Sequence, residues 1–208
     1  MLPFTLKPEP ANFETLVRIP GQLFLKGNSN PSSSQFQLHD YWTKVIEDLA
    51  AAFDHICCYS SISMRHQLGP STDHFLCKST HPQLAYEWSN YRFCCRTANE
   101  AKSTNTGILD PFMVGAGQFA IDFTRLSLAG NRCLVTVVPG PNCAANDLPI
   151  VQRTIRVLKL NEEKRFLEQR RALFELFDRK RWSAAQISEF NPFLGQEIIR
   201  QGIQPLIP

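Results

Sequence analysis

The sequence lacks the features that would place it in a membrane or outside the cell. No stretch approaches the roughly 20 consecutive apolar residues that a membrane-spanning helix requires. The first residues, MLPFTLKPEP, hold several prolines and only a short apolar run, which is unlike a secretory signal. The 7 cysteines are an odd number, so a disulfide framework is not expected. We therefore expect a soluble, cytoplasmic protein with no membrane partner.

The chain also lacks a strong net charge. Its 22 lysines and arginines against 19 acidic residues give a net charge of only +3. Affinity for nucleic acid rises with the number of phosphates neutralised, so a nucleic-acid substrate would require a local basic face or a partner. The most highly charged segment, 159–181, mixes basic and acidic residues. We interpret it as a solvated helix face, with a nucleic-acid or partner surface as the alternative.

The first half of the chain is predicted to combine an irregular arm with a mixed core. Residues 1–36 contain repeated prolines and the loop-like run GNSNPSSS, so we expect an irregular arm whose apolar residues pack on the body. Leu38 to Ile56 is predicted to be a helix, because its apolar residues recur at helical spacing. This helix opens a core region, 37–115, of an α+β fold.

The second half, 116–208, is predicted to be a β-hairpin followed by helices that pack on the core. Phe119 to Phe123 and Cys133 to Val138 have strand composition, with Gly130-Asn131 in the turn between them. Three helix starts are indicated by residue type alone: Pro149 in a first turn, Asn161 as the N-cap of Glu162 to Phe177, and Ser183 with Gln186 as a capping box.

The segment from Ser71 to Lys102 carries the candidate chemistry. It reads STDHFLCKSTHPQLAYEWSNYRFCCRTANEAK. Strands are predicted at Ile62 to Met64 and at the residues that lead into Asp73-His74, and a helix at Arg92 to Lys102. Neighbouring side chains on a strand point to opposite faces. One of the pair can therefore hold a metal while the other reaches a substrate, provided that the strand ends there.

These residue types suit the cleavage of a phosphodiester. The reaction needs an activated water and a positive charge near the phosphate, and a hard divalent cation supplies the charge. Asp73 and Asn99 offer oxygen ligands, which favour Mg²⁺ or Mn²⁺. His74 is the natural general base because an unperturbed imidazole titrates near neutral pH, and such a base contributes about 10²–10⁴-fold.

The motif resembles that of the HNH (ββα-metal) endonucleases. It is most similar to their PtuB-like bacterial subfamily, whose pattern is D-H-F-x-P-K-S…Y-E-W-S-N-Y-R-L-x-C-x-x-C-N-x-x-K. The resemblance covers Cys57 to Phe112, with a weaker echo, T-I-x-x-L-x-L-N…R, from Thr154 to Arg170. It implies a ββα-metal core and the hydrolysis of nucleic acid.

The resemblance also implies a role for each site residue. Asp73 and Asn99 would hold a single Mg²⁺ or Mn²⁺ ion. His74 would activate the water, and Asn90 would orient the histidine or its loop. Lys102 matches the last lysine of the pattern and would contact a phosphate.

One departure from the pattern concerns structural zinc, which many relatives bind through two C-x-x-C pairs. Here Cys57 is followed three positions later by Ser60, and Cys95 by Ala98. Two remaining thiols do not make a tetrahedral zinc site. We therefore expect no structural zinc, and we expect the cysteines to serve as small packing residues.

The resemblance finally implies a biological setting. PtuB-like nucleases act in Septu anti-phage defence with an ABC-type ATPase, so a PtuA-like ATPase is the expected partner. DNA is the expected substrate. RNA such as tRNA is an alternative, because the motif recognises a phosphodiester and not the sugar. A second alternative is a degenerate HNH fold that serves as a binding or scaffolding subunit.

Overall fold

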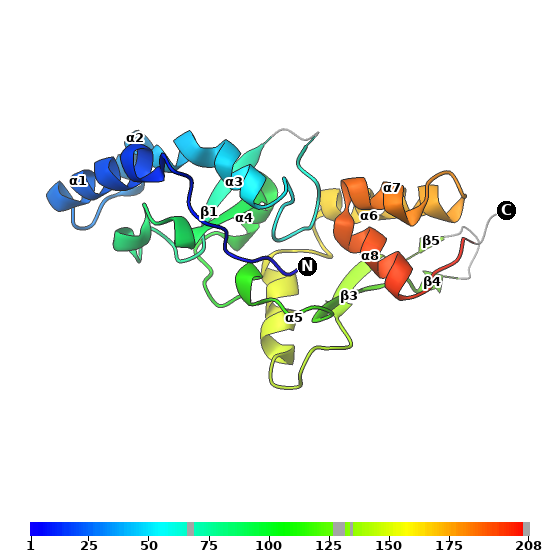
Figure 1. Ribbon diagram of the computed structural model, residues 1–208. Coiled ribbons are helices and arrows are strands. Elements are labelled where there is room, and N and C mark those ends of the chain that lie inside the picture. Colours follow the sequence, from blue (N-terminus) through cyan, green and yellow to red (C-terminus); the bar gives the residue numbers. More distant parts are fainter. Residues whose placement is uncertain (66–68, 127–131, 134, 206–208) are drawn as a thin grey trace. The chain divides into compact units, whose positions relative to one another are not determined.

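The computed structural model describes the whole chain except residues 66–68, 127–131, 134 and 206–208 (Figure 1). Helices and short antiparallel strand pairs give an α+β fold. The chain divides into two compact units. The N-terminal unit comprises Phe4–Cys58 and Met64–Thr106, and the C-terminal unit comprises Met1–Pro3, Tyr59–Ser63 and Gly107–Pro208. The boundary near residue 106 precedes the one expected at 115, and most of segment 1–36 belongs to the same unit as the motif.

The prediction of an irregular arm over residues 1–36 is wrong. This segment forms a π-helix, η1 (Glu14–Arg18), and two α-helices, α1 (Ile19–Gly27) and α2 (Ser33–Leu38). Pro20 lies in the first turn of α1, where the missing N–H costs nothing. Ser32 and Gln35 form a capping box that starts α2 within the serine-rich run.

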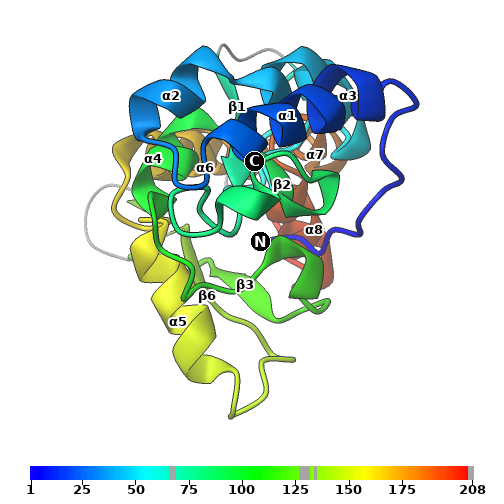
Figure 2. The ribbon, with the colours of Figure 1, turned by 90° about the vertical axis from the view of Figure 1, so that its left-hand side faces the viewer.

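The expectation that this segment packs on the rest of its unit is confirmed. Phe13 is fully buried, and its ring lies 5.6 Å from that of Trp88 and 5.9 Å from that of Tyr91. The Trp88 indole also donates a hydrogen bond to the Lys7 carbonyl, at 2.9 Å. Figure 2 shows α1 and α2, drawn in blue, at the top of the view.

The predicted helix from Leu38 to Ile56 is shorter than expected. It is a 3₁₀ helix, η2 (Tyr41–Val45), followed by α3 (Ile46–Ala52). Asp54 and His55 adopt positive φ angles of 53° and 58°, which a continuing α-helix does not allow. Most of the predicted apolar stripe is nevertheless buried, in particular Trp42, Val45, Leu49 and Phe53.

The motif forms a hairpin followed by a helix. Strand β1 (Pro70–His74) pairs antiparallel with β2 (Tyr91–Cys95), and α4 (Arg96–Lys102) follows directly. The prediction of a strand leading into Asp73-His74 is confirmed. The first predicted strand, Ile62–Met64, is wrong, because it contains only a single bridge residue. The helix begins four residues later than predicted, because Tyr91–Cys95 forms the second strand.

Side chains alternate along the strands of the hairpin and so point to two different faces. His74 faces its register partner Tyr91, on the side where Trp42 and Phe53 pack against the hairpin. Asp73 lies on the other face, with α4. The two motif neighbours therefore belong to different packing environments.

The C-terminal unit contains the predicted hairpin. Strand β3 (Phe119–Asp122) pairs antiparallel with β6 (Thr136–Pro139), and the two-residue strands β4 (Arg125–Leu126) and β5 (Arg132–Cys133) pair with each other in a separate short sheet. The strand predicted at Phe119 to Phe123 is confirmed as β3, whereas the strand predicted at Cys133 to Val138 is divided between β5 and β6, with Val135 outside both. The expected turn at Gly130-Asn131 lies outside the described residues.

Helices complete the C-terminal unit. They are the 3₁₀ helix η5 (Pro111–Met113) and the α-helices α5 (Leu148–Val157), α6 (Lys164–Asp178), α7 (Ala184–Phe190) and α8 (Pro192–Arg200). Pro149 in the first turn of α5 and the Ser183–Gln186 capping box of α7 are confirmed. Among the described residues, none of the helices has the length and apolarity needed to cross a membrane.

The predicted N-cap at Asn161 is wrong. Helix α6 starts after Glu163, whose carboxylate accepts a hydrogen bond from the Arg165 N–H. The Asn161 amide instead forms two 2.7 Å hydrogen bonds with the backbone N–H and carbonyl of Val137. A side-chain amide thus occupies the outer edge of β6, where another strand would pair.

Candidate functional site

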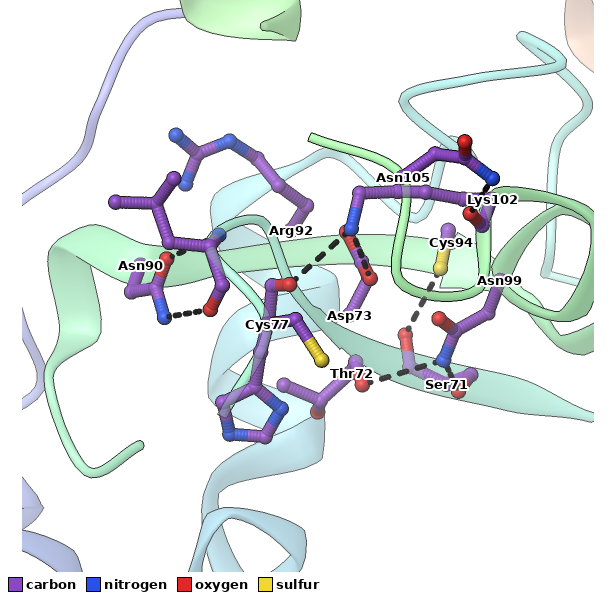
Figure 3. Close-up of polar contacts among 12 residues, drawn as sticks. Ser71, Thr72, Asp73, Cys77, Asn90, Arg92, Cys94, Asn99, Lys102 and Asn105 are labelled. Carbon is purple, nitrogen blue, oxygen red and sulfur yellow. Dashed lines mark hydrogen bonds and ion pairs between the residues drawn. The ribbon is translucent and has the colours of Figure 1, made fainter. Parts of the chain in front are cut away.

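The site is built where β1 ends. Asp73 and His74 are the last two residues of this strand. A loop then runs through two 3₁₀ helices, η3 (Pro82–Leu84) and η4 (Trp88–Asn90), before β2 begins. Helix α4 follows β2 and brings Asn99 and Lys102 back towards β1 (Figure 3). All of these elements belong to the N-terminal unit.

Asp73 forms a buried ion pair with Lys102. The Lys102 ammonium donates to Asp73 Oδ1 at 3.0 Å and to the His74 carbonyl at 3.2 Å. The two side chains are only 0% and 3% exposed. The Lys102 ammonium is thus enclosed and paired with the Asp73 carboxylate, and the expected contact of Lys102 with a phosphate stays a prediction.

Asn99 lies one helical turn before Lys102 and faces the same strand. Its amide nitrogen donates to Ser71 Oγ at 2.7 Å and to the Thr72 carbonyl at 3.4 Å. This orientation leaves the amide oxygen on the side of Asp73 (Figure 3). The structure therefore brings together the two predicted metal ligands, Asp73 and Asn99.

His74 is held as a neutral imidazole. Its Nε2 lies 2.9 Å from the Ala85 carbonyl, which can only accept a hydrogen bond, so Nε2 carries the proton and Nδ1 keeps its lone pair. Burial lowers the pKa of His74 to about 3, and the positive charges of Lys78 and Lys102 act in the same direction. The imidazole is therefore neutral at neutral pH, and its low pKa makes Nδ1 a weaker base than the unperturbed imidazole on which the sequence argument relies.

The His74 ring does not converge with Asp73. It packs edge-on against Trp42, at 4.7 Å between ring centres, and against Tyr91, at 5.2 Å. Only 6% of His74 is exposed. The sequence predicts Asp73, Asn99 and His74 in one pocket, whereas the structure places Asp73 and Asn99 on one face of the hairpin and the His74 ring on the other.

Asn90 fastens the loop that follows β1. Its amide oxygen accepts from the Leu76 N–H at 2.8 Å, and its amide nitrogen donates to the Leu76 and Leu84 carbonyls at 2.9 and 3.1 Å. Leu84 precedes Ala85, whose carbonyl orients His74. Asn90 is therefore placed to position the loop and, through it, the imidazole, as a positioning residue with no direct contact to His74.

Sequence reasoning missed two further side chains at this site. The Lys78 ammonium lies 5.2 Å from the centre of the Trp42 ring, beside His74. Arg92 is the register partner of Asp73 and is buried. Its guanidinium donates hydrogen bonds to the carbonyls of Ser89 and Tyr91. The sequence could have indicated Lys78, because it ends the D-H-F-L-C-K run of the motif. Arg92 could not be found in this way, because its position opposite Asp73 depends on strand register.

The cysteines lie next to the hairpin. The thiols of Cys57 and Cys95 are 3.7 Å apart, and Cys57 Sγ also accepts from the Cys95 N–H at 3.3 Å. Cys58 and Cys94 are buried, and burial holds the pKa of the Cys94 thiol well above its usual range. In the described part of the chain, no three His, Cys, Asp or Glu side chains are grouped as metal ligands. The absence of structural zinc stays a prediction.

The donors around Asp73 fit a hard divalent cation with few protein ligands. One carboxylate and one amide oxygen are a set that Mg²⁺ accepts when water and a phosphate oxygen complete its shell. The Lys102 ammonium now balances the Asp73 charge, so a metal ion would share that carboxylate with Lys102 or displace it.

Comparison with protein-family models and with curated proteins finds no match to this chain.

Proposed function

We propose that this chain is a metal-dependent nuclease of the HNH type. The observation that carries the proposal is the hairpin–helix unit of β1, β2 and α4. Asp73 lies near the end of β1, Asn99 of α4 has its amide oxygen on the side of Asp73 (Figure 3), and His74 follows Asp73 with its Nε2 on the Ala85 carbonyl. The motif resemblance of Ser71 to Lys102 adds the reaction class.

The chemistry follows from what each residue offers. Asp73 and Asn99 would hold Mg²⁺ or Mn²⁺, which supplies positive charge for the phosphate when it is bound. His74 Nδ1 would accept the proton of the attacking water, which requires the imidazole to leave its packing against Trp42 and Tyr91 and turn towards the face of Asp73. Asn90 maintains this arrangement through the loop backbone.

The test is a cleavage assay on plasmid DNA and, in parallel, on tRNA, with Mg²⁺ or Mn²⁺. We expect cleavage by the wild type and a loss of at least about 10²-fold in His74→Ala, the lower range for a general base. Asp73→Asn should lose activity together with Mn²⁺ binding. The matched control is His81→Ala, because His81 lies in the same loop, where its ring contacts the Thr80 hydroxyl.

The result that would remove the proposal is equal cleavage, or equal absence of cleavage, in the wild type and in His74→Ala. The assay is run with the chain alone and with any ABC-type ATPase that a neighbouring gene encodes. A PtuA-like ATPase as partner and a role in anti-phage defence are parts of the same proposal, supported by the motif resemblance and by the low net charge of +3.

A second candidate is a degenerate HNH fold that binds or scaffolds without catalysis. The enclosed Asp73–Lys102 pair favours it, since the ammonium already neutralises the carboxylate. The burial of the His74 ring points the same way. Titration with Mn²⁺ distinguishes the two candidates: binding that disappears in Asp73→Asn supports the nuclease, and absence of binding supports the scaffold.

A further inference from the structure

Lys78 lies beside the site on a well-defined turn. The N–H groups of Thr80 and His81 both donate to the Cys77 carbonyl, at 3.0 and 2.8 Å, and so close the turn around Lys78. Asn90 fixes the chain just before this turn, at Leu76. The backbone of Lys78 is therefore held in place and not left on a free loop.

The Lys78 ammonium packs over aromatic rings. It lies 5.2 Å from the centre of the Trp42 ring and 5.9 Å from that of Phe36. Lys78 is half-buried, and burial lowers its pKa. Among the described residues, the Lys78 ammonium forms no hydrogen bond and no ion pair, although the charge of Asp73 acts on it and raises its pKa against the effect of burial. A half-buried cation with three unused donors is a ready site for an anion.

The indole of Trp42 connects this cation to the candidate base. The His74 ring meets the same indole edge-on, so the ammonium and the imidazole both lie against one side chain. The charge of Lys78 lowers the pKa of His74, as expected for groups in one electrostatic environment. Lys102, the other lysine near the site, is already committed to Asp73.

We propose that Lys78 binds a phosphate oxygen of a nucleic-acid substrate, next to His74. The inference rests on the proposed function, because it takes the substrate to be a phosphodiester. A lysine ammonium is a compact charge that binds phosphate without requiring a fixed geometry. Lys78 thereby takes the role that the sequence alone had given to Lys102.

The test measures binding without cleavage. A fluorescein-labelled DNA duplex and a labelled RNA strand are titrated with the full chain in EDTA, over a range of salt concentrations. Each neutralised phosphate contributes about 0.9 to the slope of log Kobs against log salt for duplex DNA, and about 0.7 for a single strand. We expect Lys78→Gln to reduce the slope by that amount and to weaken binding roughly tenfold at 0.1 M salt.

Two variants serve as controls. Lys44→Gln removes the same charge, and its ammonium also lies over an aromatic ring, 5.0 Å from the centre of Tyr41, but Lys44 is exposed. We expect the wild-type slope in Lys44→Gln and in Lys78→Arg, which keeps the charge. Thermal unfolding of each variant confirms that it is folded.

The outcomes separate this inference from the proposed reaction. Equal slopes in the wild type and Lys78→Gln overturn it, as does an equal reduction in Lys44→Gln. A wild type that binds neither DNA nor RNA overturns it as well. If Lys78 sets the slope but no nucleic acid is cut with Mg²⁺ or Mn²⁺, the phosphate site stands and the nuclease reaction is rejected.

Discussion

At the scale of single residues, the site depends on how two charged or titratable groups tolerate burial. Asp73 is enclosed and remains compatible with burial because Lys102 supplies a cation at 3.0 Å. His74 is enclosed and remains compatible because it stays neutral and donates to the Ala85 carbonyl. Neither solution is visible in the sequence, since the motif gives residue types and spacing but not exposure.

The burial of His74 predicts a specific pH dependence of stability. The unfolded chain takes up a proton near the usual pKa of 6.5, whereas the folded chain resists protonation down to about 3. Between these values the unfolded state binds more protons, so the free energy of unfolding falls as the pH is lowered through this window. The slope due to one such group approaches about 1.4 kcal/mol per pH unit.

This dependence is measured by urea unfolding in EDTA between pH 6.5 and pH 4, with the wild type compared to His74→Gln. We expect the difference in unfolding free energy between the two proteins to change across the window. His81→Gln should keep the wild-type slope. A His74→Gln protein whose stability changes with pH in parallel with the wild type would contradict a buried neutral imidazole at position 74.

At the scale of elements, the local sequence predicted where some helices and strands start. The prediction failed where the pairing of distant segments determines the secondary structure. The capping box of Ser183 and the first-turn Pro149 each act within a single helical turn, so the local sequence was enough to predict both helix starts. The helix predicted at Arg92 to Lys102 includes Arg92–Cys95, which lies in β2 (Tyr91–Cys95). It is a strand because β1 pairs with it and α4 begins only afterwards.

The same distinction explains the candidate site. The motif resemblance implies that Asn90 orients the histidine or its loop, and the Asn90 amide bonds the loop backbone at Leu76 and Leu84. The burial of Lys102 was not predictable, because it depends on α4 packing on β1. The separation of the His74 ring from Asp73 follows from the alternation of side chains along β1. The motif alone does not show which elements pack against each face of this strand.

The hydrogen bonds of Asn90 to the loop between β1 and β2 predict what happens when this side chain is removed. Asn90→Ala deletes three hydrogen bonds to the backbone of Leu76 and Leu84. Leaving these part-buried groups unpaired should cost about 1–3 kcal/mol. Because the loop also carries Ala85 and Lys78, we expect faster amide exchange over residues 75–85 and weaker nucleic-acid binding.

Hydrogen–deuterium exchange and urea unfolding measure these two effects. The control is Asn105→Ala, which removes an amide that bonds the Lys102 carbonyl just after α4. We expect this change to leave exchange in the loop unaltered. If Asn90→Ala shows wild-type exchange over residues 75–85, then Asn90 does not hold the loop.

At the scale of the whole molecule, the two units are interleaved along the chain. Met1–Pro3 and Tyr59–Ser63 belong to the C-terminal unit, although the sequence around them belongs to the N-terminal unit. Tyr59 and Ser61 are fully buried, and the Ser63 N–H donates to the Phe190 carbonyl at 2.8 Å. The C-terminal unit therefore needs a short segment from the middle of the motif-bearing half.

This interleaving predicts that the motif-bearing half does not fold normally by itself. A chain ending at Thr106 keeps all of the N-terminal unit but leaves Tyr59–Ser63 without the residues that bury it. We expect this fragment to aggregate or to unfold without a sharp transition, because buried Tyr59 and the Ser63 N–H lose their surroundings. Circular dichroism during thermal unfolding measures the difference from the full chain.

The control is a chain ending at Gln204, which retains every described helix and strand and should unfold like the full chain. A cooperative fragment 1–106 that binds nucleic acid with the full Lys78-dependent salt slope would show instead that the candidate site needs only its own unit.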